Sequence, residues 1–128
     1  MAKDTFLARY NGHRFVDAGA YCSDDFKAFA RAFKSYLKRN LPEGCEVVEH
    51  RCGHYDVSGF VTRDGKYVYY SWSWNRCTPL DVNAGGCHDG VLFRTAKSEK
   101  DFKGGWNHFC TMTEIPERIG QMLGREAK

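Results

Sequence analysis

The chain has 128 residues, of which 42% are hydrophobic and 27% charged, and this length indicates a single globular domain. Such an apolar content excludes a disordered chain, and no apolar run approaches the roughly 20 residues of a transmembrane helix. The formal net charge of +3 neither requires nor excludes a nucleic-acid partner. Residues 1–4 do not start a signal peptide, so we expect a cytoplasmic protein of a bacterial host cell.

The first predicted element is a β-hairpin. Strand-like residues occupy 5–10 and 13–18, and Asn11-Gly12 lies between them. Asn-Gly favours a type I′ turn, because both central residues of that turn adopt positive φ. We therefore expect two short strands before the first helix.

An amphipathic helix is predicted over residues 24–40. Ser23 is a suitable N-cap, and the two acids that follow it complement the helix dipole. The apolar face, with spacings of three and four, consists of Phe26, Phe29, Ala30, Phe33 and Leu37. A second face carries Lys27, Arg31, Lys34 and Lys38. This basic face is either a solvated surface or a contact for an acidic partner or nucleic acid.

The remaining pattern predicts mainly strands. They are expected at 46–51, 55–63, 66–74, 91–95 and 106–112, followed by a short helix at 117–124. Asp64-Gly65 predicts a hairpin turn, and alternation in the strand after it places Val68, Tyr70 and Trp72 in the core. The element order predicts a single α+β domain, residues 1–128, with helices packed on an antiparallel sheet of about five or six strands.

Six cysteines suggest either disulfides or a metal site. In a cytoplasmic chain stable disulfides are rare, and no pair shows the close spacing of a structural zinc site. We therefore expect mostly buried free thiols and no cofactor. The metal-site alternative uses two i, i+2 pairs on neighbouring strands, Cys52 with His54 and His108 with Cys110.

The densest group of candidate binding residues lies between residues 94 and 108. The predicted set is Arg76, Arg94, Lys97, Lys100, Lys103, Trp74, Trp106, Asn107 and His108. Cations hold phosphates, an indole ring stacks on a base, and Gly104-Gly105 would let the backbone approach a ligand closely. The alternative is a charged connection with Trp106 buried in the core.

No catalytic motif is recognisable in the chain. It contains no nucleophile elbow, zinc-protease motif, phosphate-binding loop or dinucleotide fingerprint. Cys52, His54 and Asp56 would lie side by side along one strand, which is not the arrangement of a catalytic relay. We therefore expect a binding protein and not an enzyme.

Two stretches, HYDVSGFVTRDGKYVYYSWSW and VLFRTAKSEKDFKGGWNHFC, resemble small accessory proteins of phages and conjugative elements of gut Firmicutes. The resemblance covers residues 50–112 and transfers no catalytic residue. It implies a protein that counters bacterial immunity, as an anti-CRISPR that binds a Cas effector or as a sponge for a cyclic-nucleotide signal.

The resemblance also defines the expected partners. They are a bacterial defence protein or nucleoprotein complex, or else a nucleotide or nucleic acid, with no membrane involved. A nucleotide pocket would often be completed by a symmetric homo-oligomer. A small RNA- or DNA-binding module is the remaining alternative.

Overall fold

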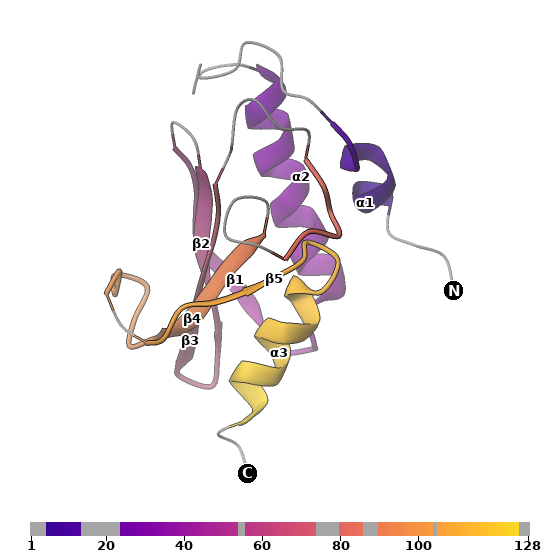
Figure 1. Ribbon diagram of the computed structural model, residues 1–128. Helices are drawn as coiled ribbons and strands as arrows, with labels where there is room; N and C mark the ends of the chain where they lie inside the picture. Colours follow the sequence, from indigo (N-terminus) through magenta and orange to yellow (C-terminus); the bar gives the residue numbers. More distant parts are fainter. Residues whose placement is uncertain are drawn as a thin grey trace.

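Five antiparallel strands form one open sheet, and the helices cover one of its faces (Figure 1). The computed structural model describes residues 5–13, 24–53, 56–73, 80–85, 90–103 and 105–125. The strands are β1 (Glu46–Cys52), β2 (Asp56–Arg63), β3 (Lys66–Ser73), β4 (Val91–Ala96) and β5 (His108–Cys110), and each pairs with the next along the chain. The helices are α1 (Thr5–Tyr10), α2 (Asp24–Asn40) and α3 (Ile115–Arg125). This arrangement confirms the predicted α+β fold with its antiparallel sheet.

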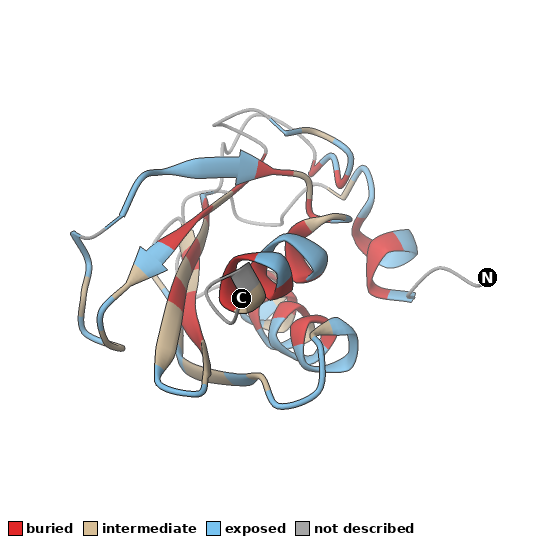
Figure 2. Ribbon diagram, turned by 90° about the horizontal axis from the view of Figure 1, so that it is seen from below, coloured by how far each residue is buried: buried red, intermediate tan, exposed pale blue. Residues whose placement is uncertain are grey.

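The inner face of the sheet packs against α2 and α3. Val68, Tyr70 and Trp72 alternate along β3 and are buried, as their spacing predicted. The neighbouring strands place Val57 and Val61 of β2 beside them on the same face. Figure 2 shows the buried side of the helices directed toward the sheet.

The helix α2 supplies most of the aromatic core, as its apolar spacing predicted. Phe26, Phe29 and Phe33 are fully buried, and the Phe29 ring lies 4.8 Å from the ring of Trp72 on the sheet. Each such side chain removes a large apolar area from water, so this contact fixes α2 on the sheet.

The helix α3 begins slightly earlier than predicted because a capping box precedes it. The Glu114 N–H donates to the Thr111 hydroxyl at 3.0 Å, and that hydroxyl donates to the Glu114 carboxylate at 3.1 Å. Hydrogen bonds from Thr111 to this carboxylate lower the pKa of Glu114. The pattern Thr-x-x-Glu therefore closes the turn that leads into α3, which begins at Ile115.

The prediction of an N-terminal hairpin is wrong. Residues 5–10 form α1, whose Phe6 and Tyr10, one turn apart, are both buried. The Phe6 ring lies 4.7 Å from the ring of Tyr36 on α2. Gly12 adopts φ +78° just beyond the helix end, so Asn-Gly terminates a helix here instead of forming a hairpin turn. The second predicted strand lies outside the described residues, apart from His13.

A polar contact joins α2 to the sheet beneath a bulge in β1. The His50 Nε2–H donates to the Ala30 carbonyl at 2.8 Å, which leaves Nδ1 to accept the Tyr70 hydroxyl at 2.5 Å. A Cβ at Gly59 would lie 2.5 Å from that hydroxyl oxygen, so glycine makes room for it. Burial lowers the pKa of His50, which keeps the ring neutral.

Among the described helices, none is both long and apolar enough to span a bilayer.

Candidate functional site

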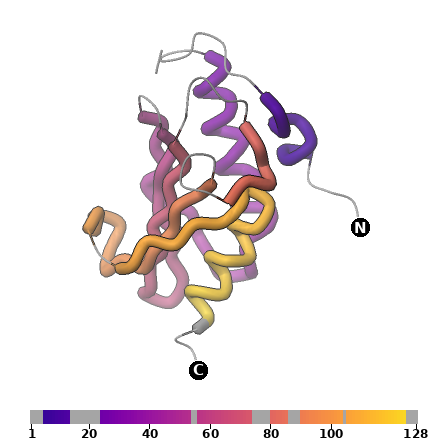
Figure 3. The backbone as a smooth tube through the Cα atoms, viewed as in Figure 1, coloured from indigo at the N-terminus to yellow at the C-terminus, as the bar shows by residue number. Residues whose placement is uncertain are grey.

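The β4–β5 loop, residues 97–107, carries most of the predicted binding residues. It projects from the sheet on the side away from the helices (Figure 3). Its exposed predicted residues are Lys97, Lys100, Lys103, Trp106 and Asn107, and His108, the first residue of β5, is exposed directly after them. The structure therefore brings these six together on one accessible segment.

Hydrogen bonds centred on Asp101 give the loop a defined conformation. The backbone N–H groups of Lys97 and Lys103 donate to the two carboxylate oxygens of Asp101, at 2.9 and 3.0 Å. The Asp101 N–H donates to the Ser98 carbonyl at 3.1 Å. Such side-chain bonds to nearby amides are how short acidic side chains stabilise turns. The negative charge of Asp101 is thus used inside the loop.

Arg94 supports the loop from below and does not face a partner. Its residue is only 5% exposed, although sequence analysis placed it among the binding contacts. The guanidinium lies 4.5 Å from the centre of the Tyr69 ring, and Nη1 donates to the Asp101 carbonyl at 3.4 Å. Alternation along β4 directs Arg94 outward and predicts an exposed side chain. The residue is buried instead because the β4–β5 loop folds over this side of the strand.

Phe102 fixes the tip of the loop on the outer face of the sheet. Its ring lies 5.4 Å from that of Phe60 and 5.9 Å from that of Tyr69, yet the residue remains 53% exposed. Sequence analysis missed Phe102, and also Phe109, which is 40% exposed on β5. For Phe109 a signal existed, because it alternates with the inward Cys110.

Gly105 brings the end of the loop back onto β4. It has φ +75°, and a Cβ there would lie 2.6 Å from the Thr95 carbonyl oxygen. The glycine therefore lets the loop backbone approach β4 closely. This contact explains a glycine at position 105 without the predicted approach to a ligand. Gly104 lies outside the described residues.

Trp106 is the most exposed of the large hydrophobic residues that the structure describes, at 86%. The alternative that Trp106 is buried in the core is therefore wrong. Together Phe102, Trp106 and Phe109 with Lys97, Lys100 and Lys103 form what we call the aromatic–lysine surface. Three large apolar side chains exposed within one short segment, residues 102–109, favour an interaction site.

Cys52 and Cys110, one from each predicted metal pair, lie too far apart to share one ion. Cys52 is on β1 and Cys110 on β5, at opposite edges of the sheet, about 19 Å apart if each of four strand spacings is about 4.8 Å. No group of three metal-ligating side chains occurs in the described part of the chain. Burial raises the pKa of the Cys110 thiol to about 12, which suits a core thiol. His54, Trp74 and Arg76 lie outside the described residues.

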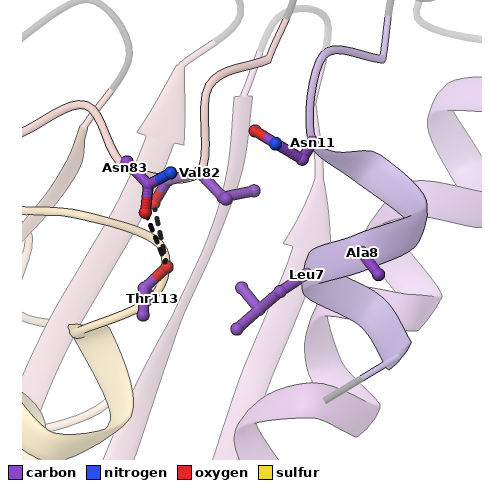
Figure 4. A pocket seen from close by; sticks show the side chains of 6 residues that line it. All are labelled: Leu7, Ala8, Asn11, Val82, Asn83 and Thr113. Atoms are coloured by element: carbon purple, nitrogen blue, oxygen red, sulfur yellow. Dashed lines mark hydrogen bonds between the residues drawn. The ribbon is translucent and has the colours of Figure 1, made fainter. Parts of the chain in front are cut away.

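A separate pocket of about 280 Å³ lies between α1 and residues 80–85 (Figure 4). The Thr113 hydroxyl donates to the Val82 carbonyl at 3.2 Å and closes one side. The lining residues are Leu7, Ala8, Asn11, Val82, Asn83 and Thr113. None of these described residues is charged, so this part of the lining offers no cation to a phosphorylated ligand.

Comparisons with protein-family models, curated proteins and solved structures gave no match. The resemblance to accessory proteins of mobile elements therefore remains a prediction. The function is argued from the aromatic–lysine surface itself.

Proposed function

We propose that this chain is a non-enzymatic binding protein that inhibits a bacterial immune complex, as an anti-CRISPR, through its aromatic–lysine surface. The observation that carries the proposal is Trp106, which is 86% exposed on a loop with its own internal hydrogen bonds. An exposed tryptophan gains little in the free protein, but buried in a partner it is among the strongest contributors to affinity.

The order of the loop strengthens this interpretation. Asp101, Arg94 and Gly105 hold the segment in one conformation, so less conformational entropy is lost when a partner binds. Phe102 and Phe109 widen the apolar contact, and the lysines supply a basic rim. A central aromatic anchor with a polar rim is the usual anatomy of a protein interface.

The basic rim favours a partner whose surface carries negative potential. Lys97, Lys100 and Lys103 steer the protein toward negative potential, such as that of a nuclease loaded with guide RNA. The cellular location and the mobile-element origin of the chain are part of this proposal.

The cyclic-nucleotide sponge has less support than a macromolecular partner. A sponge needs a concave site in which stacking rings and cations are both accessible. The described lining of the pocket between α1 and residues 80–85 is uncharged, and the pocket between α1 and α2 has Arg9 and Arg39 but its rings, Phe6 and Tyr10, are buried. The aromatic–lysine surface instead projects from the sheet (Figure 1).

Direct binding of single-stranded nucleic acid is a second candidate for the same loop. Exposed rings at Phe102 and Trp106 alternate with three lysines, and stacking rings beside cations are the features that hold a single strand. Such binding would weaken steeply as salt increases, whereas an interface anchored by Trp106 would depend on salt much less.

The test is inhibition of purified CRISPR nucleases loaded with guide RNA, measured as cleavage of a labelled target DNA. We expect the protein to form a stable complex with at least one nuclease type and to stop its cleavage. The Trp106→Ala variant should bind about 30-fold more weakly, as expected for an interface anchor. Gln121→Ala, an exposed change on α3, is the matched control and should inhibit like the wild type.

Two results would contradict the proposal. One is full cleavage by every nuclease in the panel at saturating protein. The other is that the Trp106→Ala variant inhibits a nuclease as strongly as the wild type does, because the aromatic–lysine surface would then not be the contact.

A further inference from the structure

The exposed face of α2 carries a row of four cations that the aromatic–lysine surface does not include. Lys27, Arg31, Lys34 and Lys38 are all exposed and recur every three or four residues. They lie on the side of α2 opposite its buried aromatic residues, so they share one stripe along the helix. We call this row the α2 basic stripe.

Acidic side chains do not neutralise the stripe. No acidic residue occurs between Asp25 and Glu43, and none of the four cations forms an ion pair with any described residue. Asp25 itself is engaged with His13, its carboxylate lying 3.0 Å from the imidazole Nε2. Among the described residues, therefore, no ion pair compensates the positive charge of the stripe.

The stripe is unfavourable for the isolated helix. Like charges three or four residues apart on a helix repel each other. The stripe contains three such pairs: Lys27 with Arg31, Arg31 with Lys34, and Lys34 with Lys38. Only the last turn, near Lys38, gains from the helix dipole. A polyanion laid along the helix would remove all three repulsions at once.

The dimensions of the stripe match a nucleic-acid backbone. Lys38 lies eleven positions after Lys27, which is about 17 Å at a rise of 1.5 Å per residue. One strand of a B-form duplex carries about five phosphates over that length. The stripe lies on the outside of a helix, so its geometry suits an extended polyanion better than a small ion.

An anionic membrane fits α2 less well. A helix that lies on a bilayer inserts an apolar face, but Phe26, Phe29 and Phe33 are already buried in the core. From these observations we propose that the α2 basic stripe is a second binding surface, which holds the phosphate backbone of duplex DNA by non-specific electrostatic contacts. The proposal is independent of the aromatic–lysine surface, which projects from the other side of the sheet (Figure 1).

The test is fluorescence anisotropy with a labelled duplex of about 16 base pairs, at about 50 to about 200 mM salt. For the wild type, four phosphate contacts predict that log K falls with log salt with a slope of about −3.6. The helix triple variant Lys27→Gln, Lys34→Gln, Lys38→Gln should lose about three quarters of that slope and bind at least about tenfold more weakly. Glutamine has nearly the same helix propensity as lysine, so α2 should still form.

The matched control is the triple variant Arg51→Gln, Lys66→Gln, Arg118→Gln, which changes the net charge by the same amount and lies outside both proposed surfaces. It should keep duplex affinity within about threefold of the wild type. Equal losses in the two triples would overturn the proposal, because net charge and not the stripe would then set the affinity. Absence of duplex binding by the wild type at about 50 mM salt would also overturn it.

Two further arms separate other polyanions from DNA. The other probes are a polyglutamate peptide and vesicles containing phosphatidylserine. If one of them binds the wild type and the duplex does not, the stripe binds an acidic protein or a membrane, and the proposal is refuted. Trp106→Ala should bind the duplex like the wild type. Duplex binding that survives in this variant shows that the stripe binds DNA without the aromatic–lysine surface. The two proposals can therefore fail independently.

Discussion

The inner and outer faces of the sheet both carry aromatic side chains, but these side chains have different surroundings. On the inner face Phe29 is fully buried and lies within ring-contact distance of Trp72 and other aromatic residues. On the outer side Phe102 covers part of the sheet and stays half exposed, and Trp106 is almost fully exposed. The inner set therefore stabilises the fold, whereas the outer set is available for a partner. Composition alone does not separate the two roles, because both draw on the same residue types.

The largest expected effect on the unfolding free energy is the difference between truncating a ring on the inner face and truncating one on the outer face. Phe29→Ala leaves a cavity among packed rings and should cost about 3–5 kcal/mol of unfolding free energy. Phe102→Ala should cost about 1 kcal/mol, because its ring contacts Phe60 and Tyr69 but remains in water on its other side. Urea denaturation of both variants measures the difference, and similar costs would show that the two faces are not distinct.

A smaller effect is expected at the glycine that sets the position of the loop. Gly105→Ala places a Cβ against the Thr95 carbonyl at positive φ, so it should destabilise the fold by about 2–3 kcal/mol. Gly65→Ala is the matched control, since Gly65 has φ +80° but nothing near the new Cβ, and it should cost about 1 kcal/mol. Thermal unfolding compares the two, and equal destabilisation would mean that the contact with β4 does not matter.

Acid should weaken the inner face through His50. Burial lowers the pKa of His50, so below its ordinary pKa of 6.5 the unfolded chain takes up a proton that the folded chain does not. The unfolding free energy should therefore fall as the pH drops below 6.5, with a contribution of no more than about 1.4 kcal/mol per pH unit from this residue. Urea titrations at several pH values measure this slope.

The variant His50→Gln isolates that contribution. Its amide can donate to the Ala30 carbonyl and accept from Tyr70, as the neutral imidazole does, but it does not titrate. The slope below pH 6.5 should decrease in this variant. An unchanged slope would assign the acid sensitivity to other groups.

Sequence patterns predicted the elements with long, regular periodicity. They failed where a long-range contact determines the local conformation. The spacing of Phe26, Phe29 and Phe33 predicted α2 with its observed bounds, and the turn at Asp64-Gly65 predicted the hairpin of β2 and β3. Residues 5–10 are too few for their apolar spacing to distinguish a strand from a helix, and a glycine at positive φ serves either structure.

That residues 94–108 form a binding site stays a prediction, and the internal organisation of this segment was not predicted from the sequence. The exposed lysines and Trp106 were identified from the mixture of charge and aromaticity between residues 94 and 108. The burial of Arg94 was not, because it depends on a loop that folds back over its own strand. Local sequence carries no signal for such a contact.

The smallest expected effect on stability comes with the largest expected effect on binding, in the variant Trp106→Ala. The side chain is 86% exposed, so the unfolding free energy should change by less than about 0.5 kcal/mol. The most direct test of the account is the dissociation constant of this variant for an inhibited CRISPR nuclease, measured beside its unfolding midpoint. We predict a dissociation constant about 30-fold higher with an unchanged midpoint. A dissociation constant within about twofold of the wild type would contradict the claim that the outer aromatic residues bind the partner.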